Sequence, residues 1–198
     1  MNNIVITAVG DINLSRDIKD YIKKCKNNEY KNIFKYVKKY ISNSDISIGN
    51  LESIISDNTN NKLYNSGGPS FRAENKSIEA LKYSGLNTIN ISNNHSNDYG
   101  SIGINDTINI LEKNNFNIIG KKKEPYKIYN IDNCKIIVIG LSHSFERLKK
   151  NNNVYVYNNS TKYLLQNLKK MCDLLIVTIH WGTEYKFKKN NKQKKIAK

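Results

Sequence analysis

Short apolar segments alternate along this chain with longer segments in which apolar residues recur every three or four positions. The short apolar runs predict buried strands over 4–9, 45–48, 86–92, 116–119 and 173–179. The longer periodic segments predict helices over 15–40 (interrupted at Asn27-Asn28), 74–83, 102–113 and 161–171. Two further apolar segments, 126–131 and 135–141, flank Asp132-Asn133 and predict a β-hairpin. Strands that alternate with helices require crossover connections, so the pattern predicts an α/β fold with a largely parallel sheet and one added hairpin.

The pattern predicts a single domain over residues 1–198, because no internal repeat and no Pro- or Ser-rich linker divides the chain. Cys25, Cys134 and Cys172 have no paired spacing, which argues against a disulfide framework and against a structural zinc site. The first residues lead directly into a strand, and no apolar run approaches the length of a transmembrane helix. As the sequence is written, we expect a cytoplasmic protein.

The chain is strongly basic, with 32 Lys and Arg against 17 Asp and Glu, a net charge of +15 and a pI near 9.6. Such a charge permits binding to nucleic acid, anionic lipid or an acidic polymer. The excess is nearly all Lys, scattered along the chain beside abundant Asn, Ile and Tyr, which indicates a compositional bias more than a binding patch. Because no Arg-rich run or aromatic nucleic-acid motif is present, we expect no nucleic-acid partner.

The first two predicted strands are each expected to end in a turn, at Gly10-Asp11 and at 49–52. Side chains that can bind a metal follow four of the predicted strands: Asp11, Glu52, Asn93-Asn94-His95 and His180. Parallel strands bring their carboxyl ends to one edge of a sheet, so these groups can converge. Carboxylates, an amide oxygen and imidazoles suit Mn, Fe, Zn or Mg. Each residue also has a plainer interpretation, because Asn and Asp are common in turns and helix caps, and a buried histidine can simply be hydrogen-bonded. His143 has no motif around it, and we expect it to be structural.

The order of these motifs resembles the CapA family of capsule and poly-γ-glutamate biosynthesis proteins, which are distant relatives of the calcineurin-like metallophosphoesterases. The resemblance covers about residues 5–185 and is carried by Gly10-Asp11, Asn50-Leu51-Glu52, Asn-Asn-His-x-x-Asp-Tyr-Gly-x-x-Gly over 93–103, and His-Trp-Gly-x-Glu-Tyr over 180–185. It implies a calcineurin-like metallophosphoesterase fold, which is an αββα sandwich. It also implies a divalent metal site that is dinuclear in complete family members.

The resemblance assigns metal-ligand roles to four residues. Asp11 is the ligand of the first motif, and Glu52 is a carboxylate that bridges two ions. Asn94 is a ligand through its amide oxygen, and His180 is a ligand of the second metal.

The resemblance also assigns roles around the reacting group. His95 faces the substrate as a proton donor or charge stabiliser, and Asp98 either orients His95 or caps the following helix. Trp181 and Glu184 shape the pocket. One residue departs from the metallophosphoesterase pattern, because Asn13 stands where those enzymes usually have a histidine.

A larger departure concerns the carboxyl end, where the family continues into a Gly-His-His-Pro-His-like segment that this sequence does not contain. We therefore expect a fold that is incomplete at its C-terminus, with weak metal binding, in either a fragment or a degenerate copy. Many relatives carry a membrane anchor ahead of the first strand, so a cell-envelope location is expected if such an anchor has been lost.

The leading functional hypothesis is a metal-dependent hydrolase-like protein of capsule or poly-γ-glutamate biosynthesis. Its partners would be an anionic cell-surface polymer or its precursor, together with the capsule synthesis machinery. The alternatives are a non-catalytic component that binds an acidic polymer on its Lys-rich surface, and an inactive remnant.

Overall fold

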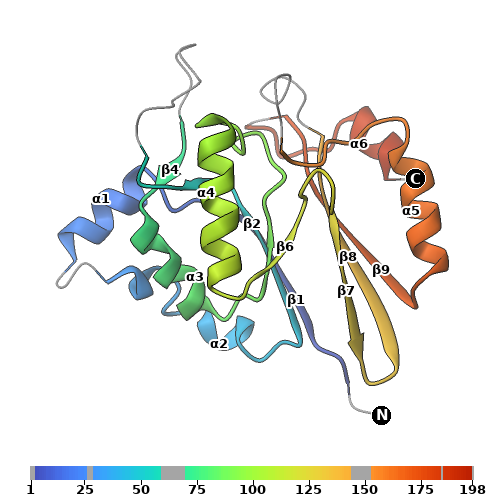
Figure 1. The fold of residues 1–198 in the computed structure, drawn as a ribbon, viewed down its shortest axis with the longest axis horizontal. Coiled ribbons are helices and arrows are strands. Elements are labelled where there is room, and N and C mark those ends of the chain that lie inside the picture. The colour runs from blue at the N-terminus through green and yellow to red at the C-terminus, as the bar shows by residue number, and fades with distance from the viewer. Residues whose placement is uncertain (1–2, 26–28, 59–69, 144–152, 184, 198) are drawn as a thin grey trace.

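Two β-sheets lie face to face between two layers of helices (Figure 1). The computed structural model describes residues 3–25, 29–58, 70–143, 153–183 and 185–197. The strands are β1 (Ile6–Ile12), β2 (Ile46–Leu51), β3 (Ile54–Ile55), β4 (Arg72–Ala73), β5 (Thr88–Asn90), β6 (Asn117–Ile119), β7 (Tyr126–Ile131), β8 (Cys134–Ser142) and β9 (Leu174–His180). The helices are α1 (Asp17–Lys24), η2 (Tyr30–Ile33), α2 (Lys38–Ile41), η3 (Asn75–Ser77), α3 (Ile78–Ser84), α4 (Gly100–Lys113), α5 (Thr161–Lys170) and α6 (Asn191–Ile196).

The first sheet has four parallel strands in the order β1-β2-β5-β6. Helices α1 to α4 cover its outer face, where Leu81 and Ile104 pack in one core with Ile89 and Ile118 of the sheet. All six residues of β2 are buried, because an interior strand of a parallel sheet is covered on both faces. The parallel order brings the carboxyl ends of these strands to one edge, as the sequence predicted.

The second sheet has the order β7-β8-β9, in which β7 and β8 form the predicted hairpin and β9 runs parallel to β8. Alternate residues of β8 face two different cores. Ile136 and Val138 pack against the first sheet, whereas Ile137 and Ile139 pack against Leu168 of α5. The predicted parallel strands and the added hairpin are present, but they divide between two main sheets, with β3 and β4 in a separate two-stranded pair. The αββα sandwich implied by the family resemblance is the fold observed.

Two strands extend further than their sequence pattern indicates. The turn expected at Gly10-Asp11 lies inside β1, where the register with β2 shifts between Ala8 and Asp11. The turn expected at 49–52 is also largely strand, because β2 continues to Leu51. These segments remain extended because the polar side chains at the strand ends find partners on neighbouring strands, which a local sequence pattern does not reveal.

Two glycines allow the sheets to approach each other where the strands of the first sheet end. A Cβ atom on Gly140 of β8 or on Gly120 would overlap the side-chain oxygen of Asn90 in β5. Gly120 also has a φ of +86°, a conformation that glycine adopts without steric cost. The amide of Asn90 therefore lies between the two sheets.

At the amino end of the chain the helices are shorter than the sequence predicted, and elsewhere they match the prediction. The segment expected over 15–40 is divided into α1, η2 and α2, and residues 26–28 lie outside the described part. The helices predicted over 102–113 and 161–171 are confirmed as α4 and α5. Within the described residues, none of the helices combines the length and the apolar character that crossing a bilayer requires.

Candidate metal centre

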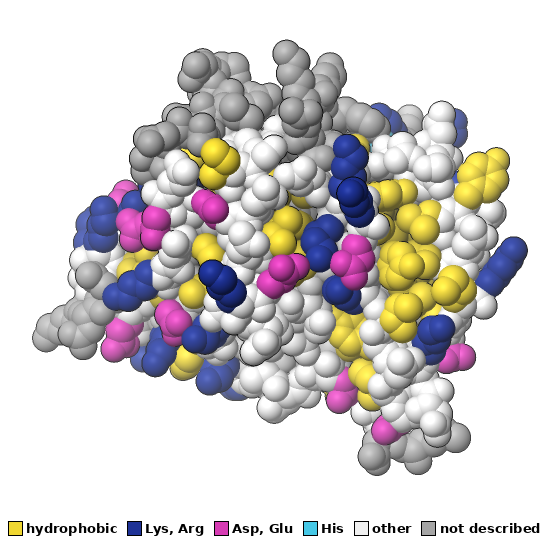
Figure 2. Space-filling model, viewed as in Figure 1, with side chains coloured by type: hydrophobic (Ala, Val, Ile, Leu, Met, Phe, Trp, Pro, Cys, Tyr) yellow, Lys and Arg dark blue, Asp and Glu magenta, His cyan; other side chains and the backbone are white. Residues whose placement is uncertain are grey.

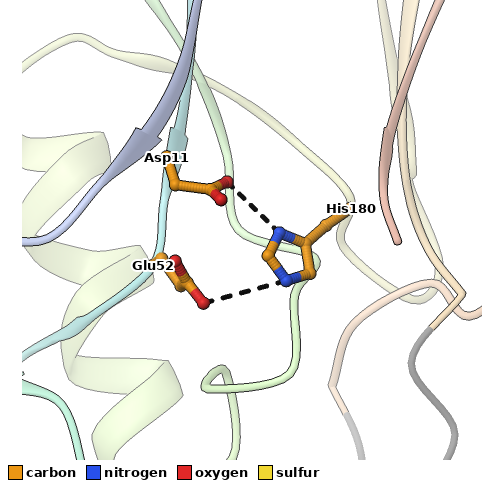
Figure 3. Close-up of side chains that lie close together, drawn as sticks. All are labelled: Asp11, Glu52 and His180. Atoms are coloured by element: carbon orange, nitrogen blue, oxygen red, sulfur yellow. Dashed lines mark hydrogen bonds and ion pairs between the residues drawn. The ribbon is translucent and has the colours of Figure 1, made fainter. Parts of the chain in front are cut away.

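Three side chains from different strands point toward one another at the carboxyl edge of the first sheet (Figure 3). Asp11 lies near the end of β1, Glu52 directly follows β2, and His180 is the last residue of β9. Each offers one ligand atom, and these atoms all lie within 4.8 Å of one another. His180 Nδ1 is 3.2 Å from Asp11 Oδ1, and His180 Nε2 is 3.8 Å from Glu52 Oε1. The structure thus brings together three of the four residues predicted to bind metal.

The fourth predicted ligand, Asn94, lies in the turn after β5 and lines the same pocket. Its Oδ1 atom is buried, and no donor among the described residues lies within hydrogen-bonding distance of it. A buried carbonyl oxygen without a donor costs free energy, which a cation at this position would offset. Two carboxylates, one imidazole and one amide oxygen are a donor set that fits Mn, Fe, Zn or Mg.

Asp11 is held in its charged form by the groups around it. Its pKa lies below the ordinary aspartate value chiefly because of its hydrogen bond with His180, and Asn50 contributes in the same direction, while burial opposes the shift. Hydrogen bonds to a carboxylate stabilise its ionised form. Asp11 is therefore ready to bind a cation without first losing a proton near neutral pH.

A network of asparagine amides lies beneath the three ligands. Asn50 Nδ2 lies 2.6 Å from Asp11 Oδ1 and 3.2 Å from His180 Nδ1. Asn50 Oδ1 in turn accepts hydrogen bonds from Asn90 Nδ2 at 2.9 Å and from Asn93 Nδ2 at 3.2 Å. Groups behind the ligands of a metal site fix their orientation, and Asn50 contacts two of the candidate ligands in this way.

His95 is fixed by a buried carboxylate on one side and faces Glu52 on the other. Its Nδ1 is 2.7 Å from Asp98 Oδ2, and its Nε2 is 3.8 Å from Glu52 Oε1. The same Asp98 oxygen accepts a hydrogen bond from the backbone N–H of Phe71 at 2.7 Å. The N-cap of α4 is Tyr99, without a side-chain capping bond, so Asp98 contacts His95 and does not cap the helix.

The four candidate ligands and His95 line a pocket of about 480 Å³. Asn13 and Trp181, which the sequence analysis also named, line the pocket as well. Glu184 lies outside the described residues. Sequence reasoning missed two other residues of this pocket, Arg16 and Phe71. Arg16 could have been noticed because arginine is rare in this chain, whose basic residues are nearly all Lys. The sequence around Phe71 carries no feature that indicates a role in the pocket.

The αββα sandwich with this edge-of-sheet site is the metallophosphoesterase fold. The chain superimposes on a phosphatase from Mycoplasma pneumoniae with a TM-score of 0.52 and 21% identity, covering 92% of this chain and 57% of that one. It also superimposes on the NAD nucleotidase of Haemophilus influenzae with a TM-score of 0.54 and 16% identity, covering 91% of this chain and 34% of that one. At these identities, the similarity establishes the fold alone.

Sequence comparison then gives the family: the chain belongs to the bacterial capsule synthesis proteins of the PGA_cap family, whose model matches residues 5–198. The capsule biosynthesis protein CapA of Bacillus anthracis is 25% identical over 210 residues, which cover 98% of this chain and 50% of that protein. The PGA biosynthesis protein CapA of Bacillus subtilis (strain 168) is 28% identical over 206 residues, which cover 96% of this chain and 52% of that protein. The chain therefore spans about half the length of these curated relatives.

Proposed function

We propose that this chain binds a divalent metal ion at Asp11, Glu52, Asn94 and His180 and uses it in hydrolysis or transfer at a phosphate- or acyl-type centre. The proposed substrate is an anionic capsule polymer or its precursor, handled together with the capsule synthesis machinery. The observation that carries the proposal is the convergence of the Asp11, Glu52 and His180 ligand atoms within 4.8 Å. The names of the two curated relatives support the capsule context.

A bound divalent ion supplies Lewis acidity, which draws electron density from the oxygen atoms of the group that reacts. The protein's part is to hold the donors in place. Asp11 and Glu52 are attached to adjacent parallel strands, and the backbone N–H of Glu52 donates to Ile12 O at 2.8 Å. This bond extends the pairing of β1 and β2 to the site and fixes the spacing of the two carboxylates.

His95 is the proposed proton donor of the reaction. Its Nδ1 is directed at Asp98, and Asp98 is buried, so the ring has one orientation. This orientation leaves Nε2 on the side of Glu52 and the pocket. A proton carried at Nε2 can pass to the leaving-group oxygen as its bond to the reacting centre breaks.

The alternative of a non-catalytic polymer-binding component depends on the positive charge. Figure 2 shows that Lys and Arg side chains are spread over the face in view and that several lie beside Asp or Glu side chains. Lys121, for example, pairs with both Glu112 and Glu124. No continuous basic patch is seen among the described residues on this face (Figure 2).

The test is the affinity for Mn²⁺, measured by calorimetric titration of the wild-type chain and of Asp11→Ala and His180→Ala. We expect both substitutions to abolish binding because each removes a ligand. His143→Ala is the matched control, since this histidine lies outside the pocket lining. Hydrolysis of p-nitrophenyl phosphate with Mn²⁺ is measured on the same four proteins.

The outcomes separate the hypotheses. Loss of Mn²⁺ binding in Asp11→Ala and His180→Ala, with His143→Ala unchanged, supports the proposed site. Equal Mn²⁺ affinity in all four proteins contradicts it. Binding of Mn²⁺ without hydrolysis, together with salt-sensitive binding of an acidic polymer that survives His180→Ala, favours the non-catalytic alternative.

A further inference from the structure

One wall of the pocket is a stack of three side chains. The rings of Phe71 and His95 are stacked, with centroids 3.8 Å apart and planes 21° from parallel. The guanidinium carbon of Arg16 lies over the Phe71 ring, 5.8 Å from its centroid. All three residues line the pocket with Asp11 and Glu52. The wall thus brings a cationic group and the proposed proton donor against the same aromatic ring.

The position of Phe71 in this wall is fixed. Its backbone N–H donates to Asp98 Oδ2, which also contacts His95 Nδ1, and both distances are 2.7 Å. Asp98 is only 1% exposed, so a single buried carboxylate holds both the His95 ring and the Phe71 backbone. An aromatic face favours a cation above it and limits the positions that a guanidinium adopts.

Arg16 itself is presented to the pocket in an uncommon way. It directly precedes α1 and has a φ of +52°, which non-glycine residues rarely adopt. Among the described residues, no carboxylate forms an ion pair with its guanidinium, although Asp11 and Glu52 line the same pocket. The N–H groups of its planar guanidinium are therefore available to donate hydrogen bonds to a ligand.

The choice of residue at this position is informative. The chain has 32 basic residues, of which 29 are Lys and three are Arg, so arginine is uncommon in its composition. Arginine differs from lysine in two properties that this position uses. Its guanidinium stacks on aromatic rings, and it binds the two oxygens of a carboxylate or phosphate with parallel hydrogen bonds.

We propose that Arg16 is a substrate-positioning residue that binds an oxyanion of the substrate, a carboxylate or a phosphate, on the Phe71 side of the pocket. The substrate class is then a molecule with an anionic group close to the bond that reacts. Holding that group against Arg16 places the neighbouring bond between His95 Nε2 and the Asp11–Glu52–His180 cluster. This inference builds on the proposed function, because the cluster defines where the reacting bond lies.

The test is calorimetric titration of inorganic phosphate and, separately, of glutarate into the Mn²⁺-supplemented protein. Wild type is compared with Arg16→Gln, Arg16→Lys and the control Lys23→Gln, which removes the same charge from an exposed position of α1. We expect Arg16→Gln to weaken binding of at least one of the two anions by about 10- to 100-fold, the range for a lost hydrogen bond to a charged group. Arg16→Lys should recover part of this affinity, and Lys23→Gln should change it less than about 2-fold, as for a screened surface charge.

The separate titrations of phosphate and glutarate identify which kind of anionic group Arg16 binds. Weakening confined to phosphate assigns a phosphate group, and weakening confined to glutarate assigns a carboxylate. Equal losses in Arg16→Gln and Lys23→Gln would overturn the proposal, because they would show a long-range charge effect. Unchanged affinity in Arg16→Gln would overturn it as well.

Failure of the proposed function gives a different result. The affinity for Mn²⁺ is titrated first, and Arg16→Gln should keep the wild-type value because Arg16 is not a proposed ligand. If the wild type binds no Mn²⁺, the metal site is wrong, and the same anion titrations on the metal-free protein still decide the role of Arg16. Thermal melting of each variant confirms that loss of anion binding does not reflect unfolding.

Discussion

The two sheets of the sandwich differ in how completely they are covered. In the first sheet, β2 is buried along its whole length between the helical layer and the second sheet. In the second sheet, β8 is buried but β9 lies at the edge, where Leu174 is 41% and Val177 37% exposed. The first sheet thus has two fully buried strands, β2 and β5, beside its partly exposed edge strand β1. In the second sheet β8 is largely buried, and both of its neighbours, β7 and β9, are partly exposed.

This difference matters because the candidate metal centre draws on both halves. Asp11, Glu52 and Asn94 belong to β1 and to the segments that follow β2 and β5, whereas His180 is the last residue of the edge strand β9. Three candidate donors are thus carried by the first sheet and one by the sheet that docks against it. The comparison implies that metal binding and the docking of the two sheets stabilise each other.

The largest expected effect on stability comes from removing a buried side chain from the first sheet. Ile89 in β5 is fully buried, so Ile89→Ala removes apolar contacts and leaves a cavity. We expect the free energy of unfolding in urea to fall by about 2–5 kcal/mol. Val177→Ala in β9 is the matched substitution in the second sheet and should cost less than about 1 kcal/mol, because the side chain is already partly solvated. Equal losses in the two variants would contradict the comparison.

A second prediction concerns the amide network under the site. Asn50→Ala removes the hydrogen bond to Asp11 and leaves the Asn90 and Asn93 amides without their common acceptor. We expect the Mn²⁺ affinity to fall by about 10- to 100-fold, the usual effect of losing a group that orients metal ligands. Calorimetric titration provides the measurement.

The control for this prediction is Asn87→Ala. Asn50 connects β2 to β5 at their carboxyl ends, and Asn87 connects the same two strands at their amino ends, through Ser47 N and Asp45 O. Each substitution should lower the free energy of unfolding by about 1–3 kcal/mol, because each leaves buried polar groups unpaired. Only Asn50→Ala should weaken Mn²⁺ binding. A similar loss of affinity in Asn87→Ala would mean that general destabilisation, and not ligand orientation, controls the site.

Much of the fold could be predicted from the sequence where the signal is local. Helix α4 and the β7–β8 hairpin show clear periodicity and turn residues, and both are confirmed. The division of the strands between two main sheets could be expected only from the family resemblance, since apolar alternation identifies a buried strand but not its partner. The residues after Gly10 and Gly49 were misassigned to turns for the same reason, because the partners that keep Asn50 inside β2 lie about 40 residues away in the chain.

The convergence of three candidate ligands could be predicted in part from the sequence, whereas Arg16 and Phe71 of the pocket wall could not. Asp11 and Glu52 could be grouped because adjacent parallel strands bring their carboxyl ends to one edge, whereas His180 reaches them from β9 of the second sheet. Phe71 reaches the pocket through a stacking contact with His95 and a hydrogen bond to Asp98. Such contacts depend on side-chain packing between distant segments, and the sequence carries no periodic signal for them.

The smallest expected effect concerns a polar contact between the sheets. Tyr129 Oη of β7 lies 2.6 Å from Thr88 Oγ1 of β5, and Tyr129→Phe removes this hydrogen bond. We expect a loss of about 1 kcal/mol in the free energy of unfolding, because Thr88 keeps its hydrogen bond to Asn87. Tyr163→Phe is the control, since Tyr163 is 69% exposed, and it should leave stability unchanged.

The pH dependence of this small effect tests whether the contact lies in the interface between the sheets. Burial raises the pKa of Tyr129 above the ordinary tyrosine value, so the phenol contributes its full stabilisation below the unfolded-state pKa and loses it as the pH rises toward the folded-state pKa. The cost of Tyr129→Phe should therefore shrink above about pH 10, where an unfolded tyrosine begins to ionise. A cost that stayed constant across this range would show that Tyr129 is solvated in the folded protein, and the docking of the two sheets would then depend on the isoleucine core alone.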